Sequence, residues 1–312
     1  MAEKVLVTGA AGYIGSILVP ALLARGYHVT ALDTYTRNDT SLAALCADAN
    51  FNPVRGDARD EALVKELLVK ADVVIPLAAL VGAPLCKQNP IAAQTTNLDA
   101  VQLITRNASK SQRIIYPTTN SGYGIGKKGQ FCTEETPLNP ISLYGVTKVE
   151  AEKLVLGESG GVSLRLATVF GMAPRMRLDL LVNDFTYRAV IDRAVVIFEG
   201  EFKRNYIHVR DVAKAFLHAL ANYEAMQGQA YNVGLSDANL SKLELCARIQ
   251  KYVPDFTFLV APIGEDPDKR DYIVSNAKLE ATGWAPEHSI DAGIQELVRG
   301  YRMIRNASFS NV

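Results

Sequence analysis

A tyrosine and a lysine four residues apart, Tyr144 and Lys148, could perform acid–base chemistry. On a helix, side chains at positions i and i+4 project from the same face, so both can reach one site. A free phenol titrates near pH 10, and a neighbouring ammonium favours its ionised form. Lowering the phenol pKa by about 3 units needs roughly 4 kcal/mol, which one lysine and one cofactor cation in a partly dry site can supply. We therefore predict that Tyr144 is a general base.

A glycine-rich turn lies near the start of the chain, Gly9-Ala10-Ala11-Gly12-Tyr13-Ile14-Gly15. It follows an apolar run at residues 5–7 and precedes an apolar helix. Glycines let the main chain turn tightly and approach a pyrophosphate, while amides at the helix start favour a bound anion. The position of this turn between a strand and a helix predicts a dinucleotide site, with Gly9, Gly12, Tyr13, Ile14 and Gly15 around the pyrophosphate.

An acidic residue, Asp33, stands at the end of the next apolar run, close to the spacing of about 20 residues that such sites show. Its carboxylate can accept hydrogen bonds from both hydroxyls of an adenosine ribose and would repel a 2′-phosphate. This favours NAD over NADP as the cofactor. Arg37 is near in the sequence and leaves NADP as an alternative.

The elements that position these residues alternate between strands and helices in the first half of the chain. Short apolar runs predict strands at 4–8, 27–32, 51–54, 72–77 and 113–116, and helical periodicity covers 60–70 and 90–109. Continuous apolar strands that alternate with helices indicate a parallel sheet covered on both faces. Right-handed crossovers then make an α/β fold with a Rossmann-type, doubly wound sheet.

The second half is less regular. It predicts a helix at 144–156, a strand at 162–168, a helix at 211–222 and a last helix at 290–304, with short Pro- and Gly-rich segments between. We expect a nucleotide-binding domain over 1–170 with a later contribution from 204–224. The remaining segments, 171–203 and 225–312, are expected to form a smaller, interleaved α/β substrate domain.

Composition excludes several classes of protein. The 312 residues include 33 basic and 33 acidic side chains, so the basic excess of nucleic-acid binders is missing. The longest apolar stretch, 71–86, contains two prolines and is shorter than the roughly 20 residues that span a bilayer. No signal-peptide pattern stands at the start, and the four cysteines are scattered without histidines at ligand spacing. We expect a cytoplasmic protein without a metal, a membrane anchor or a nucleic-acid partner.

Four motifs together resemble the extended branch of the short-chain dehydrogenase/reductase superfamily, the NAD-dependent epimerases and dehydratases of nucleotide sugars. They are the Gly-x-x-Gly-x-x-Gly turn, the Tyr-x-x-x-Lys pair and the segments 114–124 and 204–213. The resemblance implies that Asp57, followed by Ala58, meets the adenine. It also implies that Leu77, Ala78 and Ala79 pass beside the ribose and phosphates of the cofactor, and that Lys148 holds the nicotinamide ribose.

The resemblance also implies a catalytic hydroxyl. Counting back from Tyr123-Gly124 places Thr119 at the family's catalytic Ser or Thr, with Thr118 as the candidate if the register shifts by one. In 4,6-dehydratases of the family an Asp-Glu pair follows, and decarboxylases need a Glu there. This chain has Asn120 and Ser121, which are poor proton shuttles near pH 7. Oxidation of one secondary alcohol, at C4 of the sugar, is the chemistry that remains.

On the substrate side, the resemblance implies that Arg204 clamps the diphosphate of a nucleotide sugar, a task that suits a guanidinium. Arg270 is a second candidate, and Arg175, Arg177 and Asn183 are expected near the sugar. The family's usual Asn is replaced by Thr168, which leaves open whether this position contacts the cofactor.

Three segments, 76–86, 120–126 and 175–185, are similar to enzymes that oxidise C4 of a GDP-heptose in bacterial capsule synthesis. This resemblance implies a GDP-linked sugar and 2-oxoglutarate as an acceptor that discharges the reduced cofactor. The family resemblance implies a homodimer, in which helices near 92–109 and 144–156 pack as a four-helix bundle. A nucleotide-sugar 4-epimerase of the UDP-glucose type would use the same residues. A redox-inactive NAD-binding regulator is a third reading, although such proteins commonly lose the Tyr or the Lys.

Overall fold

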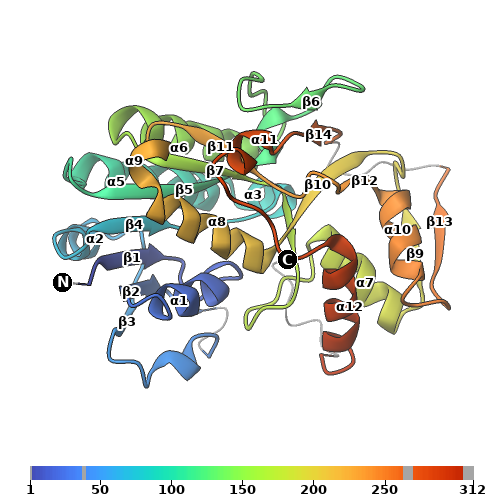
Figure 1. The fold of residues 1–312 in the computed structure, drawn as a ribbon, viewed down its shortest axis with the longest axis horizontal. Helices are drawn as coiled ribbons and strands as arrows, with labels where there is room; N and C mark the ends of the chain where they lie inside the picture. Colours follow the sequence, from blue (N-terminus) through green and yellow to red (C-terminus); the bar gives the residue numbers. More distant parts are fainter. Residues whose placement is uncertain (1, 37–39, 263–269, 305–312) are drawn as a thin grey trace.

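A seven-stranded parallel sheet forms the centre of the molecule, with strand order β11-β7-β5-β4-β1-β2-β3 (Figure 1). The computed structural model describes residues 2–36, 40–262 and 270–304. The strands are β1 (Lys4–Thr8), β2 (His28–Asp33), β3 (Phe51–Arg55), β4 (Val73–Pro76), β5 (Arg113–Thr119), β7 (Val162–Leu166) and β11 (Ala230–Val233). Every neighbouring pair runs parallel. The predicted Rossmann-type sheet is confirmed.

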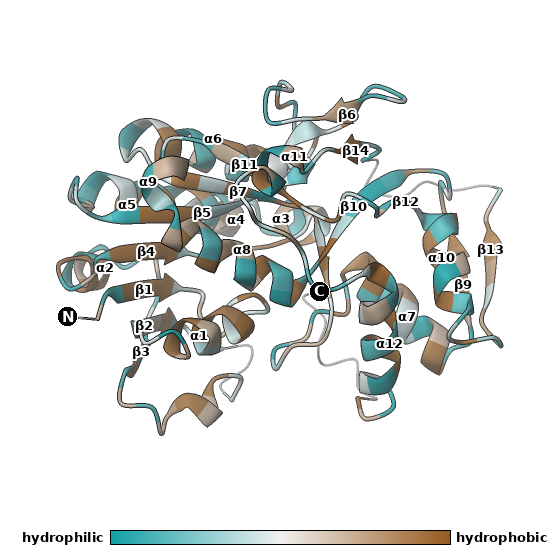
Figure 2. Ribbon diagram, viewed as in Figure 1, coloured by the Kyte–Doolittle hydropathy of each residue, from teal (hydrophilic) through white to brown (hydrophobic). Residues whose placement is uncertain are grey.

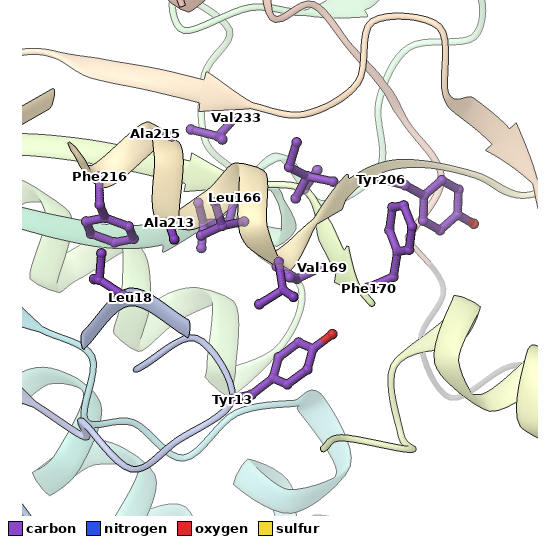
Figure 3. Packing of buried hydrophobic residues seen from close by; sticks show 14 of the residues in the cluster. Tyr13, Leu18, Leu166, Val169, Phe170, Tyr206, Ala213, Ala215, Phe216 and Val233 are labelled. Carbon is purple, nitrogen blue, oxygen red and sulfur yellow. The ribbon is translucent and has the colours of Figure 1, made fainter. Parts of the chain in front are cut away.

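Successive residues of each strand pack into two hydrophobic cores, one on each face of the sheet. This explains why the strands are apolar throughout. Val5 and Val7 pack on the side of α1 (Gly15–Leu23) and α8 (Val209–Ala221), where Figure 3 shows Leu18 and Phe216 facing each other. Leu6 packs on the opposite side. There the covering helices are α2 (Glu61–Leu68), α5 (Ala100–Asn107) and α6 (Leu143–Glu158). Period-two alternation therefore buries both faces of the sheet.

The helix predicted at 90–109 contains a π-helical segment. It is divided into α4 (Pro90–Gln94), the π segment η2 (Thr95–Asp99) and α5. Within η2, the Asn97 amide donates to Leu80 O at 2.9 Å, and its Oδ1 accepts from Leu80 N at 2.7 Å. Asn97, in the π-helical segment, therefore holds the loop that follows β4 through two hydrogen bonds to the main chain of Leu80.

The other elements form a second lobe and the connections to it. At the right of Figure 1 lie α7 (Leu181–Ile191), α10 (Lys242–Gln250), α12 (Ile290–Gly300), β9 (Ala194–Ile197) and β13 (Thr257–Val260). A three-stranded sheet joins β8 (Thr168–Phe170), β10 (Lys203–His208) and β12 (Asn239–Ser241), and β6 (Phe131–Cys132) pairs with β14 (Ile273–Val274). The short helical segments are η1 (Ala43–Leu45), α3 (Ala83–Gln88), η3 (Asn120–Tyr123), α9 (Tyr223–Met226) and α11 (Ala277–Glu280). Figure 2 shows teal and brown residues alternating along α8 and α12, as expected of helices with one buried face.

One predicted boundary needs correction. Residues 230–233 fall in the stretch assigned to the substrate domain, 225–312, yet they form β11, the edge strand of the central sheet. The strand pairs in parallel with β7, a long-range contact that local sequence patterns do not reveal. No helix in the described ranges is long and apolar enough to cross a bilayer.

Candidate functional site

A cleft of about 880 Å³ opens at the carboxyl ends of the central strands, where α/β folds bind ligands. Its walls come from the loops after β1, β2, β3, β4 and β5 and from the second lobe. The predicted residues that line it are Gly9, Gly12, Tyr13, Ile14, Gly15, Asp33, Asp57, Ala58, Leu77, Ala78, Ala79, Thr118, Thr119, Tyr144, Lys148, Arg177, Arg204 and Arg270. The structure therefore brings all but one of the predicted site residues to a single cavity.

The glycine turn is held tightly between the ends of β2 and β4. Gly9 has φ +68°, and a Cβ there would lie 2.6 Å from Ala78 N. A Cβ on Gly15 would lie 2.3 Å from Ala10 O. The Gly9 amide donates to Leu32 O at 2.8 Å. Only glycine fits at these two positions. A side chain on Gly9 would push the turn away from the end of β4, and one on Gly15 would clash with the main chain of the turn itself.

The side of the cleft beside β2 and β3 carries two carboxylates. Asp33 accepts hydrogen bonds from the amides of Ala11, at 3.0 Å, and Tyr35, at 2.9 Å, one on each oxygen. Each oxygen keeps a further lone pair for a ligand hydroxyl. Asp57 pairs with Arg59 at 2.5 Å, and hydrogen bonds from Arg59 lower the pKa of Asp57. Arg37, which left NADP open, lies outside the described residues.

Tyr144 and Thr119 both line the cleft and lie near each other. Ser142 caps the start of α6 by accepting from Gly145 N, which places Tyr144 in the first turn. Burial raises the pKa of the Tyr144 phenol, while the charges of Arg177 and Arg270 and the nearby Thr119 hydroxyl lower it, and the net shift is upward. The predicted lowering of the Tyr144 pKa by Lys148 is not observed, since Lys148 is not among the main influences on the phenol and the net shift is upward. Burial lowers the pKa of Lys148 itself to about 7.

Thr118 and Thr119 point to different partners because neighbouring residues of a strand alternate in direction. The Thr118 hydroxyl donates to Glu152 at 2.7 Å and lies 3.1 Å from Ser163 Oγ. The Thr119 hydroxyl donates to Ser121 Oγ at 2.9 Å. Thr119 is thus the hydroxyl that the structure places beside Tyr144.

A second wall of the cleft is cationic. Arg175, Arg177, Arg204, Lys242 and Arg270 all line the cleft. Arg204 is 3% exposed and lies 5.7 Å from the centre of the Tyr272 ring. Arg270 hydrogen-bonds Ser121 and Arg177 pairs with Asp179. This concentration of guanidinium groups suits a ligand with several phosphate oxygens.

Asn183 is the predicted residue that does not reach the cleft. It is fully buried in α7, where Oδ1 accepts from Gly171 N at 3.0 Å. Its Nδ2 donates to Arg177 O at 2.9 Å and to the Tyr13 hydroxyl at 3.2 Å. Its amide therefore supports the loop that carries Arg177 instead of offering a group to a ligand.

Comparisons with known proteins identify the family. A family model described as the NAD dependent epimerase/dehydratase family matches residues 5–234. The low-salt glycan biosynthesis protein Agl12 of Haloferax volcanii is 32% identical over 95% of this chain and 98% of its own length. This chain belongs to the NAD-dependent epimerase/dehydratase family.

Solved structures share the whole fold. The UDP-glucuronic acid 4-epimerase of Bacillus cereus, in complex with UDP-glucuronic acid and NAD, is 26% identical, with a TM-score of 0.84 over 96% of this chain and 99% of that one. A dTDP-glucose 4,6-dehydratase of Bacillus anthracis, in complex with NAD, has a TM-score of 0.83 over 99% of both chains at 22% identity. The second likeness concerns the fold alone.

The residues of the cleft fit the cofactor of the family, NAD. No hydrogen bond within the described ranges uses the main-chain amides of Tyr13 and Ile14, at the start of α1. A Cβ on Gly12 would meet only Gly9 O, at 3.0 Å, so the rest of its surroundings is open. Open amides at a helix start suit a pyrophosphate, and the remaining lone pairs of Asp33 suit a ribose. Elsewhere in the described residues, no group of His, Cys, Asp and Glu side chains is arranged to bind a metal.

Sequence reasoning missed two of the cationic residues that line the cleft, Arg59 and Lys242. Lys242 is 3% exposed and donates to Phe198 O at 2.7 Å. It is the first residue of α10, a position that disfavours a cation because of the helix dipole. A cation at the start of a helix was thus a sequence signal by which Lys242 could have been found. For Arg59 the sequence showed only that it is close to Asp57.

Proposed function

We propose that this protein oxidises C4 of a nucleotide-activated sugar, with GDP-heptose as the substrate, for capsule or surface polysaccharide synthesis. The observation that carries the proposal is that Tyr144 and Thr119 line one cleft together with the glycine turn and a cationic wall. The likeness of segments 76–86, 120–126 and 175–185 to GDP-heptose oxidising enzymes supports the choice of sugar.

In this proposal, each residue has one task. The Thr119 hydroxyl hydrogen-bonds the C4 oxygen. Tyr144 acts in its ionised form, which the charges of Arg177 and Arg270 and of the bound cofactor favour against burial. Its Oη removes the proton of the C4 hydroxyl as the carbonyl forms. When bound, NAD supplies the acceptor for the hydride that leaves C4. Lys148 contributes positive charge behind Tyr144, and Arg204 with Arg270 holds the diphosphate. General-base catalysis of this kind typically contributes 10²- to 10⁴-fold to the rate.

The loop after β5 argues against elimination of water. The amide of Asn120 is buried and has no hydrogen-bond partner among the described residues. Ser121 Oγ is occupied by Thr119 and Arg270. Neither side chain can exchange a proton with a sugar near neutral pH.

A 4-epimerase acting on a UDP-sugar is the second candidate, and the UDP-glucuronic acid 4-epimerase of Bacillus cereus supports it equally. It would use the same tyrosine and threonine, but the keto sugar would turn before the hydride returns. A redox-inactive NAD-binding regulator is disfavoured because Thr119, Tyr144 and Lys148 are all retained.

We further propose that the protein acts in the cytoplasm as a homodimer, through helices at 92–109 and 144–156. 2-Oxoglutarate would accept the hydride from the reduced cofactor. We assign 1–170 and 204–224 to cofactor binding, with β11 added to them, and 171–203 and the rest of 225–312 to substrate binding.

Products distinguish these functions. The holoenzyme is incubated with GDP-D-glycero-D-manno-heptose, UDP-glucose or UDP-glucuronic acid, and the sugars are followed by NMR. We expect a 4-keto heptose with one equivalent of reduced cofactor, and multiple turnovers after 2-oxoglutarate is added. Recovery of a 4-epimer alone, without keto sugar or net reduction, would establish the epimerase instead.

A further inference from the structure

The buried ammonium of Lys148 has an aromatic ring as its direct partner. Its Nζ lies 4.0 Å from the centre of the Tyr116 ring. Both side chains are buried, with exposures of 4% and 0%. Within the described ranges, Lys148 makes no hydrogen bond or ion pair with another side chain. A cation this close to a ring face is attracted by the ring quadrupole, most strongly where water is excluded.

Glu152, the acidic residue that acts on Lys148, binds other side chains. It follows Lys148 by one turn of α6 and raises the pKa of the lysine. Its carboxylate, however, binds Arg165 at 2.7 Å and accepts from Thr118 at 2.7 Å and from Ser163 at 2.6 Å. Arg165 neutralises this charge, so Glu152 cannot replace the ring as the partner of Lys148.

The ring of Tyr116, rather than its hydroxyl, is the useful part of the side chain. The hydroxyl is buried without a hydrogen-bond partner among the described residues. Burial, together with the charges of Tyr144 and Glu152, raises its pKa well above the ordinary value. The phenol therefore stays neutral and cannot substitute for Tyr144 as a base.

Lys148 is close to losing its proton at neutral pH, because burial lowers its pKa to about 7. The ionisable groups around it are Tyr144 and Glu152 on α6, Tyr116 on β5 and, beyond Glu152, Arg165 on β7. Of these, the Tyr116 ring contacts the ammonium directly. A cation–π contact favours the protonated form and opposes the effect of burial.

We propose that Tyr116 is a positioning residue for the reaction: its ring holds the Lys148 ammonium in place and keeps it charged while Tyr144 acts as the base. The inference rests on the proposed function, since it assumes that Tyr144 and Lys148 act together on a sugar.

Two substitutions separate the ring from the hydroxyl. Tyr116→Phe keeps the ring, whereas Tyr116→Leu removes it. The turnover number is measured from pH 6 to 9 with whichever of GDP-D-glycero-D-manno-heptose, UDP-glucose and UDP-glucuronic acid the wild type converts. We expect Tyr116→Phe to keep the wild-type profile. For Tyr116→Leu we expect the high-pH limb to move down by about one pH unit, with a loss of about tenfold at pH 8 and an unchanged KM.

If Tyr116→Leu disturbs the fold, a series of fluorinated phenylalanines at position 116 still tests the role of the ring. Phenylalanine and its mono-, di- and trifluorinated forms at position 116 have nearly the same shape but progressively weaker ring quadrupoles. We expect turnover at pH 8 to fall with each fluorine, and a flat series would overturn the inference. Tyr144→Phe separates a failure of the proposed function from a failure of the role of Tyr116. If Tyr144→Phe stays active, the proposed function is wrong. If Tyr144→Phe is inactive but turnover does not change along the fluorinated series, only the role of Tyr116 is rejected.

Discussion

The two walls of the cleft are built in different ways. The cofactor wall consists of short turns at the ends of neighbouring strands, and its residues follow one another in sequence order from Gly9 to Ala79. The cationic wall takes Arg177 from the loop before α7, Arg204 from β10, Lys242 from α10 and Arg270 from the approach to β14. One wall depends on local main-chain geometry, and the other on long-range packing of separate segments.

This difference predicts how each wall responds to change. The cofactor wall is rigid, because Gly9 and Gly15 have backbone atoms within 3 Å of where a Cβ would be. The cationic wall contains long side chains that can rearrange. We therefore expect substitutions in the first to act through the main chain and those in the second through lost charge.

The largest expected effect on turnover comes from Tyr144, which lines the cleft together with both walls. Tyr144→Phe removes the proposed base and should lower the turnover number by at least about 100-fold. Binding of NAD, measured by calorimetry, should be unchanged, because the ring remains. Tyr252→Phe, outside the cleft, is the matched control. Turnover within twofold of wild type would contradict the catalytic assignment.

Gly9→Ala tests the rigidity of the cofactor wall. The new Cβ would lie 2.6 Å from Ala78 N in a residue with φ +68°, so the turn must move away from β4. We expect NAD affinity to fall by about 10- to 100-fold and the free energy of unfolding by roughly 1 to 3 kcal/mol. Gly26→Ala shares a positive φ, +83°, but meets no atom within 4 Å, and should leave NAD affinity unchanged. Equal losses in both variants would show that backbone strain alone is responsible.

Arg204→Met tests the cationic wall. The substitution keeps most of the apolar stem but removes a nearly buried charge. Hydrogen bonds to charged groups contribute about 1.5 to 3 kcal/mol, so we expect KM for the nucleotide sugar to rise about 10- to 100-fold. NAD affinity should stay constant. The control is Arg193→Met, whose ion pair with Asp255 at 2.7 Å lies outside the cleft. Weaker NAD binding in Arg204→Met would mean that the two walls are not separable.

The same contrast explains what the sequence could predict. The glycine turn, Asp33 and the Tyr144–Lys148 pair are recognised by spacing within one turn or one strand–helix unit. The apolar strands likewise predict the parallel sheet, since each strand is buried on both faces. All of these features depend on neighbours in the sequence.

Features that depend on distant neighbours were predicted less well. Asn183 was expected near the sugar, but its partners, Tyr13 and Gly171, come from other parts of the chain. β11 was missed as a sheet strand because only its pairing with β7 identifies it. The count back from Tyr123-Gly124 favoured Thr119 over Thr118 but left a register shift open. The predicted strand ended at residue 116, whereas β5 continues to Thr119, and alternation along it separates the two hydroxyls.

The smallest expected effect concerns a link between the two lobes. Glu296 of α12 accepts from Met172 N at 2.9 Å and from Arg210 at 2.7 Å, and lies 3.2 Å from His208 Nε2. Burial raises the pKa of Glu296, but these three partners outweigh it and lower the pKa to about 2. The carboxylate thus stabilises the fold fully above its ordinary pKa, near 4.5, and this contribution is lost as the pH falls through about 2.

Glu296→Gln should therefore lower the free energy of unfolding at pH 7 by about 1 to 2 kcal/mol, after allowance for the partial exposure of the group. The Tm difference from wild type should be a few degrees at pH 7 and should shrink steadily between pH 4.5 and pH 2. Glu287→Gln, which removes an exposed ion pair with Lys214, serves as the control and should change Tm little at any pH. A Tm difference for Glu296→Gln that stays constant down to pH 2 would show that Glu296 acts through its shape, because a charged link between the lobes must weaken once the carboxylate is protonated.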